Sequence, residues 1–496
     1  MRRVMRPAIT LMVATGLMTV AACSSSGSGT KAASSSAPTA AATTAAASTA
    51  AASTPASGSA VASASAPTSG SAPAVNTSVS GSFTWWGWTP DTPVAAKYIV
   101  DFNKIYPNIK IKYTNYENAD YAPTMSTAFQ TGNGPDIFDV SAGGNVGGKQ
   151  LWGQYAMDMT PVAQQALGDG WKDKFATGYV DDLSVNGKVD ALPLGGVAAD
   201  FFWIDKDVFD KVGVSTDIKT YADLKAACDK FQAAKVQCFT MGTNSTDTFS
   251  TELLRTIMSS IDPTAYMKGL LGQESWDNPV FIQAIGIMRQ MQTDGIISQN
   301  ATSIKQYPDA NNAFLSGKAA IVQMGTWYAQ YAAKASMVNS MKGAGVTNPV
   351  PFTMIPIVSP DFAGKGNIPG YVGEADYGLA INAKSKNAAA AKIFVTWITT
   401  TKQGQQDVGN AIDLVPALKG VQADWPNLGL VSPSVQIPLF QKMFTDAANA
   451  PETRNLHISA QTGNAQVIAV QEALSDKSKS ADAIAKEAQK NSVALP

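Results

Sequence analysis

Histidine is nearly absent from this chain, since His457 is the only one among 496 residues. Zinc sites built from several histidines are therefore excluded, and a histidine-dependent catalytic triad would rest on that single side chain. Cysteine is also scarce, with only Cys23, Cys228 and Cys238. We expect neither a metal ion nor another cofactor.

The first 82 residues lack aspartate, glutamate and every aromatic residue. Three arginines precede a short apolar run over residues 8–22, which is typical of an export signal and too short for a typical transmembrane helix. Residues 24–80 are almost entirely Ala, Ser, Thr, Gly and Pro, so they cannot bury enough apolar surface to offset their ordering entropy. The sequence predicts a signal peptide over 1–22 and a disordered linker over 23–82.

The end of the apolar run, Val20-Ala21-Ala22-Cys23, resembles the lipobox of bacterial lipoproteins. This resemblance implies that the signal is cut before Cys23 and that the thiol is acylated, for example with palmitate. The acyl chains would anchor the protein on the outer face of the cytoplasmic membrane. The alternative is ordinary signal cleavage beside a chance cysteine.

Lipidation of Cys23 would leave Cys228 and Cys238 as a pair. The first lies in a helical pattern over 221–232 and the second in a strand pattern over 236–241. An oxidising compartment permits a disulfide between them. Two buried free thiols are the alternative.

Residues 83–496 hold all 38 acidic residues but only 33 of the 37 basic ones, so their formal charge is −5. An acidic balance argues against nucleic acid as a partner. A segment of this size would normally split into two lobes. Strand patterns alternate with helical ones, which predicts an α/β fold with mainly parallel sheets. The expected strands are 83–86, 109–113, 137–140, 319–324 and 377–381; the expected helices are 94–105, 121–130, 208–212, 221–232, 281–292, 311–315 and 388–400.

Several short segments, taken in order, resemble the sugar-type extracellular solute-binding proteins of ABC importers, which are maltose-binding-protein-like (family 1). Each segment alone is weak, but their order and spacing cover nearly all of 83–420. The segments are 83–86, 101–111, 131–137, 186–188 with 191–193, 203–209, 314–320, 325–327 and 389–399.

The resemblance implies a two-lobed periplasmic-binding-protein-like fold of type II, with hinge-linked lobes and crossings near 194–198, 318–321 and 370–378. One lobe would comprise 83–195 and 319–372, and the other 196–318 and 373–496. A small-molecule carbohydrate would bind between the lobes, and a membrane permease would receive the closed form. We expect a monomer.

Open parallel sheets bind ligands beyond the carboxyl ends of their strands. Trp88 and Asp91 follow the first strand, Asp139 and Asn145 lie at the end of the third, and Trp327 follows the strand over 319–324. Indoles stack on sugar C–H faces, while carboxylates and amides accept from hydroxyls. These five residues are the main candidates for the site, although each tryptophan could instead pack in the core.

Further candidates are Trp203, at a position often occupied by tyrosine in the family, and Glu374, at an expected crossing. Asp200 and Asp247 are weaker candidates.

Two other functions compete with sugar capture. A lipid-anchored glycosidase would need two carboxylates astride the cleft, which Glu374 with Asp376 or Asp91 could supply. The same fold could also bind another solute, such as a polyamine, which would require several carboxylates around aromatic rings. Neutral carbohydrate is the best-supported ligand class, and no catalysis is expected.

Overall fold

The computed structural model describes residues 78–143, 146, 148–245, 249–450, 453–454 and 456–494. The predictions for the signal peptide, for Cys23 and for nearly all of the linker fall outside these residues. Among the described helices, none combines the length and apolar character that a bilayer span requires.

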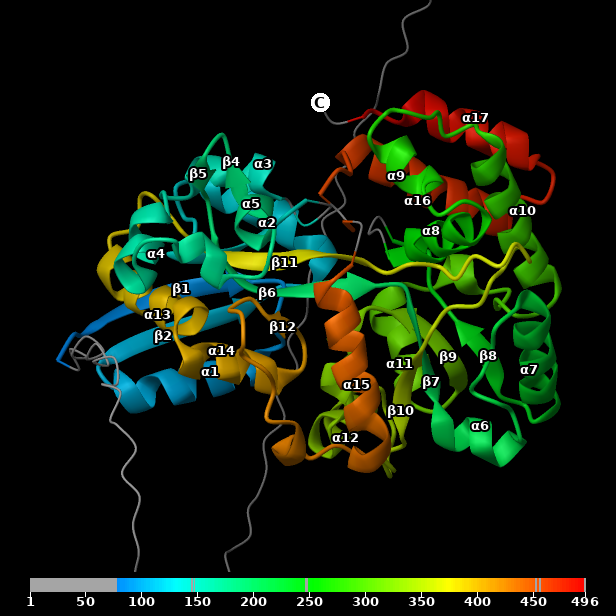
Figure 1. Cartoon of the computed structure of the whole chain (residues 1–496), viewed down its shortest axis with the longest axis horizontal. Helices are drawn as coiled ribbons and strands as arrows, with labels where there is room; N and C mark the ends of the chain where they lie inside the picture. Colours follow the sequence, from blue (N-terminus) through cyan, green and yellow to red (C-terminus); the bar gives the residue numbers. More distant parts are fainter. Residues whose placement is uncertain are drawn as a thin grey trace, which may run out of the picture. The chain divides into compact units, whose positions relative to one another are not determined.

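The first lobe is built on a six-stranded sheet with the order β12-β6-β11-β3-β1-β2 (Figure 1). Strands β1, β2 and β3 are parallel to one another, whereas β11 runs antiparallel to β3 and β6, and β12 antiparallel to β6. The strands are β1 Gly81–Gly87, β2 Ile109–Asn115, β3 Ile137–Ser141, β6 Leu192–Ala199, β11 Val372–Ile381 and β12 Val415–Pro416.

Alternation of side chains along β1 places Phe83 and Trp85 in the core of this lobe, where both contact Phe394 of α13. Trp85 is fully buried. The other elements of the lobe are α1 Thr92–Ile105, α2 Asn118–Gln130, α3 Lys149–Trp152, α4 Thr160–Leu167, α5 Tyr179–Asp182, β4 Ser184–Val185, β5 Lys188–Val189, α13 Ala388–Thr400 and α14 Lys402–Ala411.

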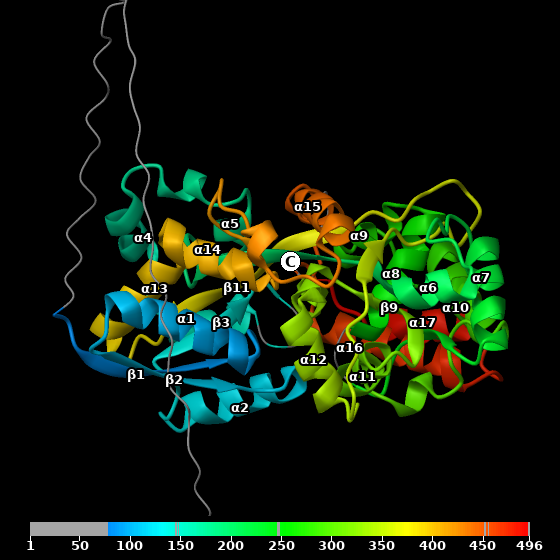
Figure 2. The same ribbon diagram turned by 90° about the horizontal axis from the view of Figure 1, so that it is seen from below.

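The second lobe is built on a four-stranded sheet with the order β10-β7-β9-β8. Its strands are β7 Phe201–Asp205, β8 Gln237–Thr240, β9 Ala319–Met324 and β10 Met354–Ile357. Its helices are α6 Lys206–Val212, α7 Tyr221–Ala233, α8 Phe249–Ile261, α9 Ala265–Leu270, α10 Pro279–Thr293, α11 Asn311–Leu315, α12 Lys334–Gly343, α15 Pro433–Ala448, α16 Ala460–Ser475 and α17 Ala481–Asn491. Figure 2 shows these helices grouped apart from β1, β2 and β3.

A disulfide joins Cys228 of α7 to Cys238 of β8 in the second lobe. Both cysteines are buried, in the core formed by α7, α8, α10 and the sheet. The bond therefore ties a covering helix to an edge strand of the sheet.

The sheets are mixed, which corrects the expectation of mainly parallel sheets. Among the described strands, parallel pairing occurs between β1 and β2, between β1 and β3, and between β8 and β9. The strands that carry the chain between lobes, β6 and β11, pair antiparallel to each other. Local strand–helix alternation does not encode this long-range pairing.

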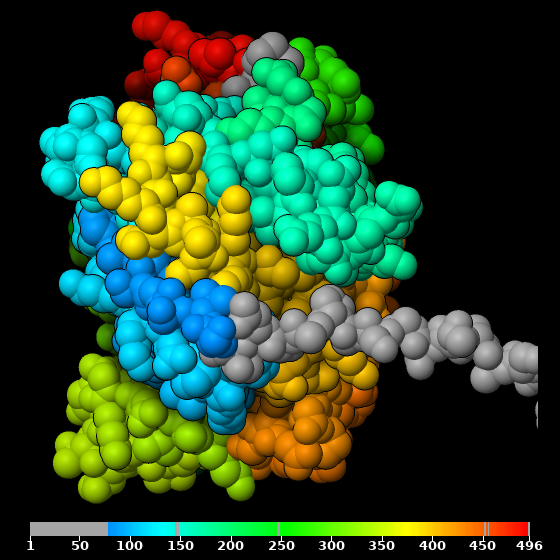
Figure 3. All heavy atoms as spheres, turned by 90° about the vertical axis from the view of Figure 1, so that its left-hand side faces the viewer, coloured from blue at the N-terminus to red at the C-terminus, as the bar shows by residue number. Residues whose placement is uncertain are grey.

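The expected lobe boundaries also need correction. Residues 319–324 form β9 of the second sheet, between β7 and β8, so no crossing occurs near 318–321. Residues 373–381 belong to β11 of the first sheet, and α13 and α14 pack in the first lobe. Figure 3 shows the resulting discontinuous lobe, in which the blue-to-teal and yellow-to-orange parts of the chain share one face.

Within the described residues, the chain crosses between the two sheets at three places. The first is Asp200, between β6 and β7, the second lies between β10 and β11, and the third follows β12. Asp200 has a φ of 80°, a left-handed conformation that is uncommon for a residue other than glycine. The first predicted crossing, near 194–198, therefore lies next to an observed one.

Candidate ligand-binding cleft

A cleft of about 480 Å³ lies between the lobes, with walls from both. The first-lobe wall consists of Trp88, Thr89, Asp91, Asn115, Tyr116, Glu117, Asn118, Ala119, Asp120, Asp376 and Asp413. The second-lobe wall consists of Ser245, Phe249, Lys305, Tyr307, Pro308, Trp327, Gln330, Tyr331 and Arg454.

Trp88 dominates the first wall directly after β1. Its half-buried indole packs against Tyr121 and Tyr377, with ring centroids 5.1 and 5.5 Å away. Thr89 follows and donates a hydrogen bond to Asp413 Oδ2 at 3.3 Å, which links the end of β1 to the segment before β12. This wall therefore presents an aromatic ring beside carboxylates.

Trp327 has the matching place on the second wall, just after β9. Its Nε1 donates to the hydroxyl of Tyr307 at 3.2 Å, and Phe249 lies 6.1 Å from it between ring centroids. Phe249 and Tyr307 also contact edge to face at 5.4 Å. The second wall is thus a cluster of mutually packed aromatic rings.

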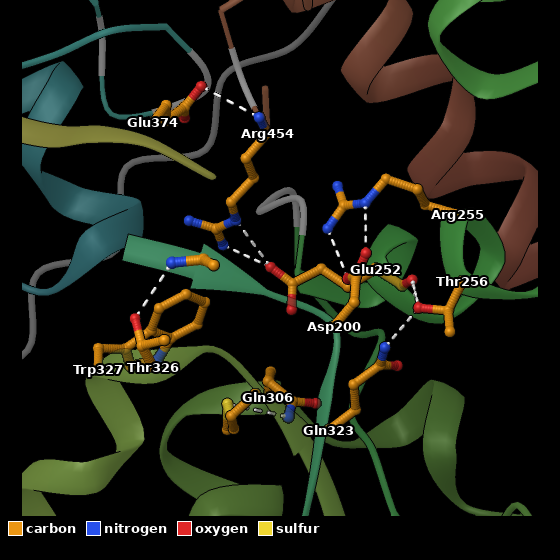
Figure 4. Close-up of polar contacts among 12 residues, drawn as sticks. Asp200, Glu252, Arg255, Thr256, Gln306, Gln323, Thr326, Trp327, Glu374 and Arg454 are labelled. Atoms are coloured by element: carbon orange, nitrogen blue, oxygen red, sulfur yellow. Dashed lines mark hydrogen bonds and ion pairs between the residues drawn. The ribbon is translucent and has the colours of Figure 1, made fainter. Parts of the chain in front are cut away.

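The guanidinium of Arg454 lies 4.6 Å from the ring centroid of Trp327 (Figure 4). Its Nε donates to Glu252 Oε1 at 3.0 Å, and Nη2 donates to the same oxygen. The backbone N–H of Arg454 donates to Glu374 Oε2 at 3.2 Å. One residue therefore connects a cleft indole, α8 and β11.

Helix α8 also holds the crossing at Asp200. Arg255, one turn after Glu252, donates from Nε and Nη2 to the two carboxylate oxygens of Asp200 at 2.8 and 2.6 Å. Both side chains of this pair are almost fully buried. Helix α8 thus contacts both a crossing segment and the residue that backs Trp327.

Two carboxylates of the first wall have strongly perturbed acidity. Burial raises the pKa of Asp376 to about 6, although the charge of Arg454 partly opposes this shift. Burial also raises the pKa of Asp413 well above its usual range, and the negative charges of Asp376 and Asp91 add to the effect. Asp413 is buried, Asp376 is half-buried, and other carboxylates lie near Asp413.

Three of the predicted site residues line the cleft: Trp327, Trp88 and Asp91. They come from two strand ends, β1 and β9, that lie in different sheets. Asn145 and Asp247 lie outside the described residues.

Glu374, Asp139 and Trp203, which were also expected to contact the ligand, are buried and are not among the described residues that line the cleft. Glu374 accepts from the backbone N–H groups of Arg454 and Leu456. Asp139 accepts from Trp85 Nε1 at 2.8 Å, and burial raises its pKa well above the ordinary value. Trp203 donates to the carbonyl of Gly325 at 3.0 Å, next to Trp327.

Asp200, a weaker candidate, has its carboxylate occupied by Arg255. The sequence reading missed Tyr307, Tyr331, Asp413 and Arg454. Only Tyr331 offered a signal, since it lies four residues after Trp327 in the same helical segment. Within the described part of the chain, no group of His, Cys, Asp and Glu side chains could hold a metal ion.

Comparison with known proteins gives a consistent assignment. The family model for bacterial extracellular solute-binding proteins matches residues 86–405. Two proteins of Pyrococcus horikoshii, both named as ABC transporter extracellular-binding proteins, are 24% identical over 259 residues and 22% identical over 267. These matches cover 49% and 53% of this chain but only 55% and 58% of the relatives, so the chain spans little more than half their length.

Solved structures share the fold. One, from a study of xylan utilization by Caldanaerobius polysaccharolyticus, has a TM-score of 0.64 at 22% identity and covers 82% of this chain and 99% of its own. A chitin oligosaccharide binding protein has a TM-score of 0.64 at 19% identity, with 83% and 98% covered. Maltose-bound MalE3 of T. maritima has a TM-score of 0.65 at 18% identity, with 82% and 98% covered.

Proposed function

The chain belongs to the family of bacterial extracellular solute-binding proteins, and we propose that it captures a mono- or oligosaccharide and delivers it to the permease of an ABC importer. One observation carries the choice of a sugar: Trp88 and Trp327 stand on opposite walls of one cleft, beside carboxylates. Indole faces stack on the C–H faces of sugar rings, and carboxylates accept hydrogen bonds from hydroxyls. Two neighbours of the same fold support this choice: one is bound to maltose, and the other is named as a chitin oligosaccharide binding protein.

Capture requires contact with both walls. A sugar held between Trp88 and Trp327 would stabilise the arrangement in which the lobes approach each other, because it binds that arrangement more tightly than a separated one. The permease would then recognise the liganded form. The permease as partner and import as the direction of transport are part of this proposal.

Members of this family are non-enzymatic components of transport systems. All carboxylates among the described lining residues of the cleft come from the first lobe. A glycosidase needs two carboxylates flanking the scissile bond. The described walls offer no such pair across the cleft.

Membrane attachment is a separate part of the proposal. The lipobox-like segment supports acylation of Cys23 and a location on the outer face of the cytoplasmic membrane. Cys23→Ser should move the protein from the membrane fraction into the soluble fraction. Retention of the variant on membranes would contradict acylation at this residue.

A thermal-shift screen against sugars, polyols, polyamines and amino acids tests the ligand class. A sugar at about 100 times its Kd should raise stability by about 2.7 kcal/mol. The sugar assignment is wrong if only an amino acid or an acyclic polyamine shifts the melting temperature.

The successful sugar then tests the site. Trp327→Ala and Trp88→Ala should each weaken binding about tenfold or more, because each removes one stacking surface. Trp327→Phe and Trp88→Phe, which retain a ring, are the matched controls and should lose less. Unchanged affinity in both alanine variants would exclude this cleft.

A further inference from the structure

The walls of the cleft differ in charge. The first-lobe wall carries five carboxylates, those of Asp91, Glu117, Asp120, Asp376 and Asp413, and no lysine or arginine among its described lining residues. Asp91, Glu117 and Asp120 are exposed at the surface, whereas Asp413 is buried and Asp376 is half-buried. A ligand in the cleft would therefore face acidic groups at two depths.

The cations of the opposite wall do not balance this charge. Lys305 and Arg454 are its two basic residues, and Lys305 is exposed. Arg454 is already neutralised by Glu252 and lies over the ring of Trp327 (Figure 4). The lining residues thus carry an excess of negative charge that the described protein groups leave uncompensated.

Asp376 is the carboxylate of the cleft wall that is best placed to pair with a ligand. It projects from the crossing strand β11 into the cleft, and no described residue donates a hydrogen bond to it. Among the described residues, its buried neighbour Asp413 accepts hydrogen bonds from two neutral groups, the hydroxyl of Thr89 and the amide of Gln330. Burying ionised carboxylates beneath a neutral ligand is costly unless a positive charge accompanies it.

The aromatic residues of the cleft also suit a cation. Trp88, Tyr307, Trp327 and Tyr331 line the same space as the two carboxylates. The faces of aromatic rings attract ammonium groups, and the same faces stack on sugar rings. Rings and carboxylates together favour a ligand that is both a carbohydrate and a cation.

We propose that the sugar captured in this cleft carries a protonated amine, which pairs with Asp376 and Asp413 while the sugar ring stacks on Trp327. This inference rests on the proposed function and narrows its substrate class to amino sugars. The amine supplies N–H donors to Asp376, and its charge compensates the acidic wall.

Isothermal titration calorimetry on the full exported protein tests the pairing. The probes are glucosamine, galactosamine and β-1,4-linked glucosamine oligomers, each compared with its N-acetylated counterpart, which has the same ring but no charge. The amine form should bind about tenfold tighter or more, the effect of one charge-assisted hydrogen bond, and added salt should reduce this preference. Asp376→Asn should abolish it, whereas Asp229→Asn, which removes an exposed carboxylate of α7, should not.

Each other result overturns the inference. Equal or tighter binding of the N-acetylated forms, or a preference that survives Asp376→Asn together with Asp413→Asn, would show that the amine is not read by these acids; sugar capture would still stand. A neutral sugar outside this set that binds more tightly than every amino sugar would likewise overturn the amino-sugar inference and leave sugar capture standing. Binding of spermidine with no binding of any sugar would overturn both the amino-sugar inference and the proposed function, as would a complete lack of sugar binding.

Discussion

Arg454 shows how one side chain can serve both stability and ligand binding. It is buried, shares an ion pair with Glu252, and supports the ring of Trp327 from 4.6 Å. Breaking a buried pair from one side leaves an uncompensated charge and costs about 3–5 kcal/mol. We therefore predict that Arg454→Met lowers the free energy of unfolding by about that amount in urea titrations.

The double variant Glu252→Gln with Arg454→Met is the control. It removes both charges, so it should recover much of the stability that the single variant loses. Ligand affinity should be reduced in both the single and the double variant, because in each the indole of Trp327 lacks the neighbouring guanidinium. Equal instability of the single and double variants would contradict this account.

The acidity of Asp376 leads to a pH-dependent prediction. Burial raises its pKa to about 6 in the folded protein, whereas an unfolded aspartate titrates near 3.9. Between about pH 4 and 6 the folded state therefore binds more protons than the unfolded state, and this group's contribution to stability decreases as pH rises. That contribution is complete below about pH 4 and is lost as pH rises through about 6.

Asp376→Asn should therefore stabilise the unliganded protein at pH 7 by about 1–2 kcal/mol, allowing for partial solvent exposure, and change little near pH 4. Melting temperatures of both proteins across this pH range provide the test. Asp205, whose pKa burial also raises to about 6, contributes equally to both proteins and cancels in the comparison. If Asp376→Asn were less stable than the original protein at pH 7, burial of the ionised Asp376 carboxylate would not be destabilising, and this account would be wrong.

At the scale of elements, the disulfide between α7 and β8 restrains a short part of the second lobe. It links cysteines separated by 10 positions, and closing a loop of this size stabilises a protein by about 2–3 kcal/mol through the unfolded state. Reductant should therefore lower the free energy of unfolding by about that amount. Reductant should not change the stability of the variant with Cys228→Ala and Cys238→Ala. If reductant lowered the free energy of unfolding of this variant as much as that of the original protein, the disulfide would not be the cause.

The same scale shows what local sequence could predict. The strands at 109–113 and 137–140 and the helices at 94–105 and 121–130 were expected where β2, β3, α1 and α2 occur, because amphipathic periodicity is a local property. The lobe boundaries were wrong because the pairing of β9 with β7 and of β11 with β6 joins residues more than 100 positions apart. Periodicity within a strand does not specify its distant partner.

The site, like the fold, could be predicted only where it depends on local sequence. Trp88 and Trp327 follow strands that the sequence reveals, so their places at the ends of sheets could be inferred. Tyr307 lies in a short helical turn over Gln306–Ala310, and Asp413 and Arg454 lie outside helices and strands. Only the assembled molecule brings these residues to the cleft. Asp139 was expected in the site as a strand-end residue and Glu374 as a residue at a crossing, but in the fold they accept hydrogen bonds from Trp85 and Arg454.

At the scale of the whole molecule, the two walls imply that ligand binding brings the lobes together. Trp88 belongs to the first lobe and Trp327 to the second, so a sugar that stacks on both favours their approach. We predict that the radius of gyration, measured by small-angle X-ray scattering, decreases when the best sugar of the screen saturates the protein. Trp88→Ala, also measured at saturation, should reduce the change, because the ligand then keeps its stacking surface on one lobe only. Saturation without any change in the radius of gyration would mean that one wall is sufficient for binding, and the two-walled capture proposed for this protein would have to be abandoned.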